Sequence, residues 1–119
     1  MPKRKIKATI ENNDNKVLTN TTAIYQDNII KYKEDDGTTV IYNYNKHKLT
    51  RENEELKIEY IFIEKKNTKG LLFIKELNKT MEISIKTKII EENKINTYIE
   101  FEIDKETFKY EIEAIKWVY

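Results

Sequence analysis

Apolar and polar residues alternate along almost the whole chain, and short polar segments containing Asn, Asp or Gly interrupt the alternation every few residues. A period of two is typical of a β-strand that buries one face. This pattern occupies so much of the sequence that little chain is left for helices, long loops or a catalytic insertion. The alternation therefore predicts an all-β fold.

About ten strand-like segments can be recognised, with short connections between them. They cover residues 3–11, 16–25, 28–34, 38–44, 47–52, 56–63, 69–76, 80–90, 94–103 and 107–119. Connections this short join antiparallel neighbours, because a parallel crossover needs about a dozen residues. Asn lies in or beside almost every turn, where it tolerates a left-handed backbone. Asp35-Asp36-Gly37 is the strongest hairpin signal, and Gly70 indicates a bulge or a close backbone approach.

An antiparallel up-and-down meander of this many strands must hide one apolar face and two edges, and closing into a barrel does both. We therefore expect about 8–10 strands closed into a barrel, forming a single domain over residues 1–119. A two-layer sandwich is the competing arrangement. Its Greek-key connections are longer than any gap between the predicted strands.

The apolar register also predicts partners in the last three strands. Facing residues of an antiparallel pair project to the same side, so we expect Ile83 opposite Phe101 and Phe101 opposite Tyr110. The phase then slips at residues 114–115, which turns Ile115 and Trp117 away from the face of Tyr110. A bulge or a corner in the last strand would cause such a slip.

Charge and composition limit the classes of partner. The chain has 22 Lys and Arg against 21 Asp and Glu, a net charge of +1, without the single-sign field that nucleic acid or anionic lipid usually requires. No apolar run approaches the ~18–20 residues of a membrane span, and residues 1–10 lack the apolar centre of a signal peptide. Cysteine is absent, which excludes disulfides and thiol chemistry. We expect a cytoplasmic protein that binds neither nucleic acid nor membrane.

Short segments spread over most of the chain carry a family resemblance. They are Tyr32-Lys33-Glu34, the Thr-rich strand at 38–41, Leu49-Thr50-Arg51, the strand ending in Phe62, the strand at 81–87 and the strand through Tyr98. In this order and spacing they resemble the bacterial YwiB-like family, calycin-type barrels without an established function. The resemblance implies a lipocalin-like barrel, a fold that often encloses one small apolar ligand. Asn53 and Asn78 depart from glycines that are common in the family, and the Gly-x-Trp of true lipocalins is missing from the first strand.

The sequence offers no catalytic, cofactor or metal centre. His47 is the sole histidine; without cysteine, zinc would depend on carboxylates, against its normal preference, and we expect His47 to be solvent-exposed. Ser84 is the only serine and has no Gly-rich elbow. Carboxylates such as Glu82 and Glu100 lie on the polar phase, where lysines can pair with them. We predict that the protein is not an enzyme.

A set of tyrosines suggests the most specific functional hypothesis. Tyr42, Tyr44, Tyr60 and Tyr110 fall on the inward phase, and buried phenols need hydrogen-bond partners. If their hydroxyls converge with the Arg51 guanidinium at one mouth of the barrel, they can orient a small polar or anionic ligand above an apolar floor. A tightly filled core with phenols at its rim explains the same pattern, and small barrels adopt either arrangement.

Two functions follow from this sequence. The first is a non-enzymatic barrel that binds a small ligand in its interior. The alternative is an interaction or assembly module, acting through a sheet edge or through the outward apolar residues Ile115, Trp117 and Tyr119. A homo-oligomer is compatible with both functions, and the sequence does not fix the oligomeric state.

Overall fold

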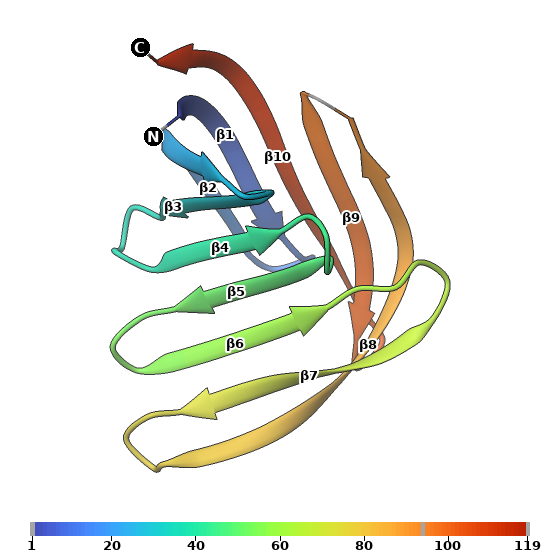
Figure 1. Ribbon diagram of the computed structural model, residues 1–119. Coiled ribbons are helices and arrows are strands. Elements are labelled where there is room, and N and C mark those ends of the chain that lie inside the picture. Colours follow the sequence, from blue (N-terminus) through green and yellow to red (C-terminus); the bar gives the residue numbers. More distant parts are fainter. Residues whose placement is uncertain (1, 94, 119) are drawn as a thin grey trace.

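Ten β-strands make up the protein in a computed structural model, which describes residues 2–93 and 95–118, the last three by their backbone alone (Figure 1). The strands are β1 (Lys3–Glu11), β2 (Lys16–Gln26), β3 (Ile29–Lys33), β4 (Thr39–Asn43), β5 (Lys48–Glu52), β6 (Leu56–Ile61), β7 (Asn67–Ile74), β8 (Lys79–Glu92), β9 (Asn96–Ile103) and β10 (Glu106–Val118). The predicted strands are confirmed, with ends that differ by a few residues. These described residues include no helix that could cross a membrane.

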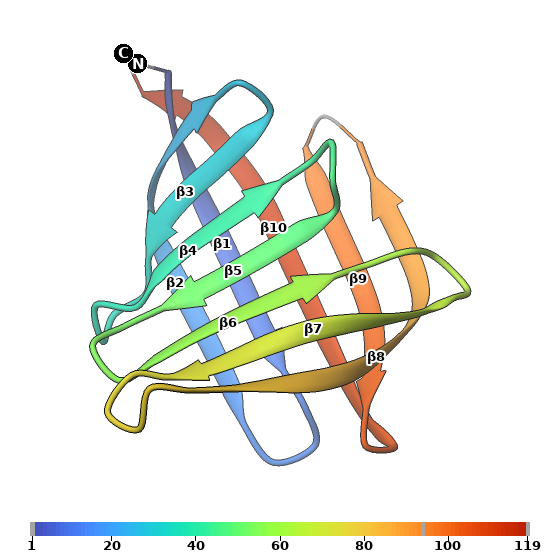
Figure 2. The ribbon, with the colours of Figure 1, turned by 60° about the horizontal axis from the view of Figure 1, so that its bottom comes forward.

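Each strand pairs antiparallel with the next, and β1 pairs with β10, which closes the sheet into a barrel (Figure 2). The predicted closed meander is confirmed, and the two-layer sandwich is excluded. Consecutive hairpins of a meander turn at opposite ends of the barrel. We name the end that carries the turns after odd-numbered strands the Arg51 mouth, and the opposite end the His47 mouth.

The expected register of the last three strands is wrong. Phe101 faces Phe108 in β10 and Thr87 in β8, while Tyr110 faces Ile99. The β9–β10 turn consists of two residues at positive φ, 51° and 67°, and a hairpin turn of this length fixes the register of the strands that follow it. A bulge between Thr87 and Ile89 changes the phase of β8 as well, so Ile90 rather than Ile89 packs against the core.

The predicted slip in the last strand is a β-bulge. Lys5 of β1 faces Lys116, whereas the next residue, Ile6, faces Ala114. Ile115 is therefore the extra residue of β10, and its side chain is 58% exposed while that of Ala114 is buried. Trp117 lies beyond the bulge in the strand, and its side chain is outside the described residues, as is Tyr119.

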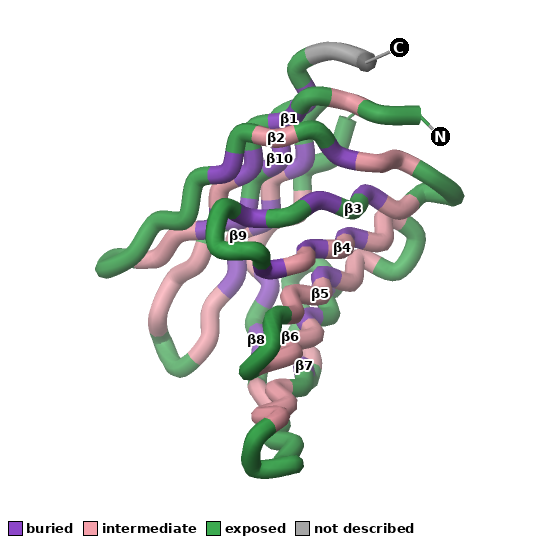
Figure 3. Tube along the Cα trace, turned by 90° about the vertical axis from the view of Figure 1, so that its left-hand side faces the viewer, coloured by how far each residue is buried: buried purple, intermediate pink, exposed green. Residues whose placement is uncertain are grey.

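Side chains on the inner face of the barrel form one core (Figure 3). Fully buried residues include Val40, Tyr42, Leu49, Ile99 and Phe101, each 0% exposed. The far end of the β7–β8 hairpin extends beyond this core, where Leu77 and Met81 are 66% and 43% exposed. The inward phase predicted for the tyrosines is thus the face that forms the core.

Four asparagines close their turns with the same contact. In each of them the side-chain Oδ1 accepts hydrogen bonds from the backbone N–H groups two and three residues later; they are Asn12, Asn43, Asn53 and Asn93. Only Asn28 and Asn78 have the left-handed backbone that the sequence suggested for turn asparagines. These four asparagines therefore act through the side chain, which replaces a backbone acceptor in the turn.

Candidate ligand-binding site

Aromatic rings fill the middle of the barrel. Tyr60 stacks on Phe62 with ring centroids 6.0 Å apart, Phe62 lies 4.8 Å from Phe101, and Phe101 stacks on Phe108 at 5.4 Å. Contacts at these distances leave little space between the rings. Hollows that reach the inward-facing side chains lie instead at the two mouths.

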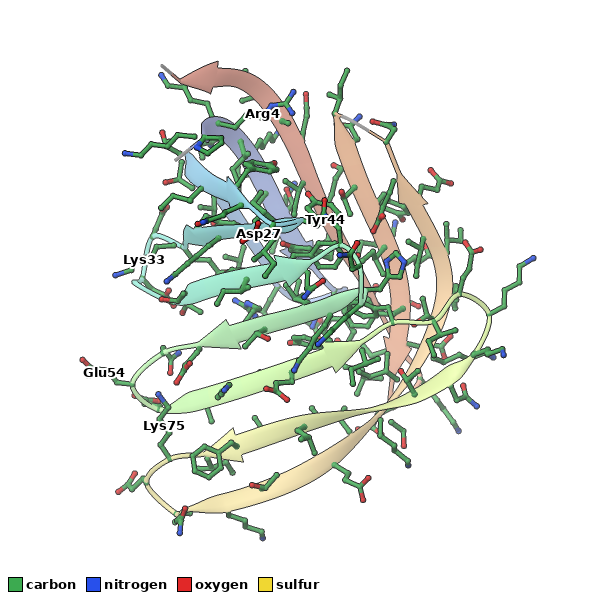
Figure 4. The ribbon with its side chains drawn as sticks, viewed as in Figure 1. Arg4, Asp27, Lys33, Tyr44, Glu54 and Lys75 are labelled. Carbon is green, nitrogen blue, oxygen red and sulfur yellow. The ribbon has the colours of Figure 1, made fainter. Side chains whose placement is uncertain are left out.

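The five residues predicted to bind a ligand do not meet at one mouth. Arg51 and Tyr60 line a hollow at the Arg51 mouth. Tyr42 and Tyr44 contact each other edge to face at 4.9 Å on the other side of the core, and Figure 4 shows Tyr44 at the opposite end of the strands from Lys33, Glu54 and Lys75. Tyr110 lies between the two groups, with its ring 6.1 Å from that of Tyr42.

At the Arg51 mouth, the guanidinium is already occupied. Arg51 donates from Nε and Nη2 to the two carboxylate oxygens of Glu34, at 3.1 and 2.5 Å. The side chains are 20% and 4% exposed. Burial is the largest single effect and opposes the charge of Arg51, but the hydrogen bonds and the charge of Glu34, together with Tyr60, outweigh it and raise the pKa of the guanidinium. Arg51 therefore has a built-in anion, which the sequence analysis did not identify.

Two tyrosine hydroxyls continue inward from this ion pair. Tyr32 and Tyr110 hydrogen bond through their hydroxyl oxygens at 2.9 Å, and burial is the largest cause that raises the pKa of both phenols. Both phenols are consequently neutral at physiological pH. The hollow at this mouth measures about 110 Å³, below the roughly 300–1,000 Å³ of a typical ligand site. This group of side chains fits a structural role.

The His47 mouth carries a second polar cluster. The Tyr42 hydroxyl donates to Glu92 Oε1 at 2.7 Å, and His47 Nδ1 lies 3.1 Å from both of these oxygens. Burial and the adjacent Glu92 carboxylate raise the pKa of Tyr42, so the phenol remains a neutral donor. The single phenolic proton of Tyr42 points at Glu92, so neither the phenol oxygen nor the carboxylate oxygen can donate to His47. His47 must therefore carry its proton on Nδ1 and donate it to these two oxygens. His47 Nε2 is then free to bind another group.

A hollow of about 490 Å³ adjoins this cluster. It is lined by His47, Phe62, Ile63, Glu64, Ile90 and Glu92. The volume is in the range of small-molecule sites, and the lining combines a few polar groups with an apolar floor. The mouth can therefore hold a small molecule between the imidazole and the apolar side chains.

The position of His47 corrects the sequence analysis. We expected a solvent-exposed residue, but the side chain of His47 is only 36% exposed and has two hydrogen-bonding neighbours. Glu92 is 45 residues away in the chain and comes after the bulge in β8, so no local pattern connects it to His47. The inward phase of Tyr42 was the one part of this cluster visible in the sequence.

Other surface features are less suited to bind a ligand. A larger hollow of about 870 Å³ lies outside the barrel over the turns of the Arg51 mouth, but it has no aromatic lining, and Lys75 there pairs with Glu52 at 2.8 Å. Within residues 2–93 and 95–115, no three His, Asp or Glu side chains are grouped as metal ligands. Among the residues predicted for interaction, Ile115 is exposed.

Comparison with known proteins identifies a related fold. No family model matches the chain, and no curated protein does. The crystal structure of the ywiB protein from Bacillus subtilis aligns with 97% of this chain and 92% of its own, with a TM-score of 0.57 and 16% sequence identity. At this identity the likeness concerns the fold alone. The chain has a YwiB-like barrel fold.

Proposed function

We propose that the protein is a non-enzymatic, cytoplasmic, calycin-like barrel of the YwiB-like family, and that it binds a small molecule at the His47 mouth. One observation carries the proposal: the Tyr42–Glu92–His47 cluster adjoins a hollow of about 490 Å³ with an apolar floor. The volume is in the range of small-molecule sites, and three apolar side chains line the hollow beside His47, Glu64 and Glu92.

The ligand is placed at the mouth rather than in the middle of the barrel. Stacked rings occupy the middle, and a ligand there would have to displace buried aromatic side chains, at a large cost in packing. At the His47 mouth, a ligand instead covers surface that is open to solvent. Tyr42 and Tyr44 then support the site from below, while Arg51, Tyr60 and Tyr110 stabilise the fold.

The lining of the hollow favours a neutral or cationic ligand over an anion. Two carboxylates, Glu64 and Glu92, face a single imidazole, and none of the described residues that line the hollow is a Lys or Arg. Glu64 accepts a hydrogen bond from the Ile90 N–H at 2.8 Å, which holds its carboxylate at the rim. An amine or amide group near His47 and Glu92, with an apolar body over Ile63, which is 48% exposed, satisfies these side chains best.

Native mass spectrometry of the protein isolated from its own host tests the proposal. We expect a bound species of a few hundred daltons, typical of a ligand that fills such a volume. Its occupancy should fall in His47→Asn, which removes the imidazole but keeps a residue that tolerates the positive φ of 48° at this position. Lys105→Asn is the matched control, because Lys105 also has a positive φ, 67°, and lies in a turn at the Arg51 mouth.

The two variants separate the possible results. If both keep the bound mass, the ligand does not contact His47, and the site is elsewhere. If the wild-type protein carries no bound mass from its host and none is acquired from a host metabolite extract, the binding function itself is wrong.

A further inference from the structure

Most of strand β2 pairs on one side only, in the part of the chain that the structure describes. Residues 16–24 pair with β1 in an unbroken register, but β3 pairs only with residues 24–26. Residues 16–23 therefore have β1 as their only strand partner. The β1–β2 hairpin extends past the end of the shorter strand β3 (Figure 2).

The backbone groups of this segment point outward at every second residue. In an antiparallel pair, the N–H and C=O of one residue point to the partner strand and those of the next point away. Asn15 O bonds to Asn12 N across the β1–β2 turn, and Tyr25 N bonds to Pro2 O, so odd-numbered residues of β2 face β1. The backbone groups of Leu18, Asn20 and Thr22 thus face the side where β3 is absent.

Native proteins usually protect such an edge with charge, proline or a bulge. Lys16 is a charge at one end of this segment, but residues 17–23 have none of these features. Residues 17–23 read Val-Leu-Thr-Asn-Thr-Thr-Ala, without a charged residue in a chain that is 36% charged. Their register with β1 is regular. Val17 and Leu18 are 38% and 40% exposed. An uncharged edge rich in β-branched residues is a template for another strand.

The sequence of the edge is complementary to itself. Thr19-Asn20-Thr21 reads the same in both directions. In an antiparallel pair of two such edges centred on Asn20, the two Asn20 residues exchange backbone hydrogen bonds, and each Thr19 faces Thr21 of the other copy. Cross-strand threonine pairs stabilise a sheet, and no like charges are opposed. The net charge of +1 gives little repulsion between two copies.

The geometry points to a homodimer in which residues 18–22 of β2 pair antiparallel with the same residues of a second copy. This pairing uses three outward-facing residues per copy and ends before Ile24, where β3 joins β2. It covers the exposed side of Leu18 with Thr22 of the second copy. The inference rests on strand pairing alone and is independent of the ligand proposed at the His47 mouth.

The dimer can be tested by placing a charge at the centre of the interface and measuring association by sedimentation equilibrium. Asn20→Lys places two like charges next to the two-fold axis and should weaken association at least about tenfold. Asn96→Lys is the matched control, because Asn96 is also an exposed asparagine on a strand and already faces Glu113 in β10. We expect reversible dimers for the wild type and for Asn96→Lys, and monomers for Asn20→Lys.

The absence of cysteine from the chain permits a second measurement of the same pairing. Directly opposed residues that exchange hydrogen bonds have Cα atoms about 5.5 Å apart, within the roughly 4.4–6.8 Å of a disulfide. Asn20→Cys should therefore form a disulfide-linked dimer under mild oxidation, much faster than Asn96→Cys.

Two results would overturn the inference. The first is a wild-type protein that sediments as a monomer at every accessible concentration, which would leave the edge free for a strand of a different protein. The second is a dimer that persists in Asn20→Lys while Asn20→Cys links no faster than Asn96→Cys, which would place the dimer contact on another surface.

Discussion

Arg51 and Glu34 form an ion pair inside the barrel, with side chains that are 20% and 4% exposed. From the sequence we expected the Arg51 guanidinium to lie with tyrosine hydroxyls at one mouth of the barrel, but we did not pair it with Glu34. That partner could have been found, because the period of two that turns Tyr32 inward also turns Glu34 inward. His47 and Glu92 are different: they lie in separate hairpins, and only the closed barrel brings them together.

The ion pair gives a prediction for single substitutions. Arg51→Met keeps most of the side-chain volume but removes the partner of the Glu34 carboxylate. Glu34 is 6% exposed, so the carboxylate would be buried without a counter-ion. Removing one member of a buried pair typically lowers the free energy of unfolding by about 3–5 kcal/mol. Urea unfolding followed by circular dichroism measures this loss.

The double variant Glu34→Leu, Arg51→Met is the control for this ion pair. It removes both charges and should recover a large part of the lost stability, because apolar residues of similar volume often replace a buried pair without cost. If Arg51→Met unfolds at the wild-type urea concentration, the carboxylate is solvated and the pair does not hold the mouth together.

At the scale of strands and turns, the sequence predicted where the strands lie better than it predicted which residues of neighbouring strands face each other. The alternation located all ten strands, and Asp35-Asp36-Gly37 forms the β3–β4 turn, with Gly37 at a φ of 91°. The bulge in β10 was visible as a phase slip because apolar residues stand on both sides of it. The bulge in β8 was not, since Ile89 and Ile90 are both apolar and either can continue the pattern.

The two glycines of the chain are required for different reasons, and this can be tested. A Cβ on Gly70 would lie 2.5 Å from the carbonyl oxygen of Glu59 and 2.9 Å from Cδ1 of Ile85, which confirms the close approach expected there. Gly70→Ala must push β6 and β7 apart and should cost about 1–3 kcal/mol, as overpacked sites do.

Gly37 is the matched control for this effect. A Cβ there would have no neighbour within 4 Å, and the cost comes from the positive φ, about 1–2 kcal/mol for most residues. Asn tolerates this backbone, so Gly37→Asn should lose less stability than Gly37→Ala, whereas Gly70→Asn should lose more than Gly70→Ala. Thermal unfolding of the four variants shows whether Ala or Asn costs more stability at each position. If Asn costs less than Ala at both positions, the steric explanation for Gly70 is contradicted.

For the whole molecule, the sequence predicted that the sheet closes into a barrel. It did not predict whether side chains fill the interior of the barrel or leave a cavity. Closure is the economical way to hide one apolar face and two edges of a long meander. Filling depends on how rings from distant strands orient against each other, as with Tyr60 of β6 and Phe101 of β9, whose ring centroids lie 5.7 Å apart. The period of two identifies which side chains point inward, but it does not fix whether they meet.

The filled interior makes the stability of the barrel sensitive to alkaline pH. Burial raises the pKa of the inward phenols, which include Tyr32, Tyr42, Tyr60 and Tyr110. A group whose pKa is raised in the folded state contributes stability that is complete below the unfolded pKa, about 10 for tyrosine, and is lost as the pH rises above it. We therefore expect the urea midpoint to be constant up to about pH 10 and to fall steeply above it.

Phenolate absorbance recorded together with circular dichroism identifies the groups responsible. The inward phenols should ionise only as the strand signal is lost. Tyr98 lies on the outer face, where burial and then Glu100 raise its pKa to about 12, and Tyr98→Phe should shift the alkaline transition less than removal of an inward phenol does. Full ionisation of the tyrosines near pH 10 with an intact strand signal would mean that the interior admits water, and the middle of the barrel would again be available to a ligand.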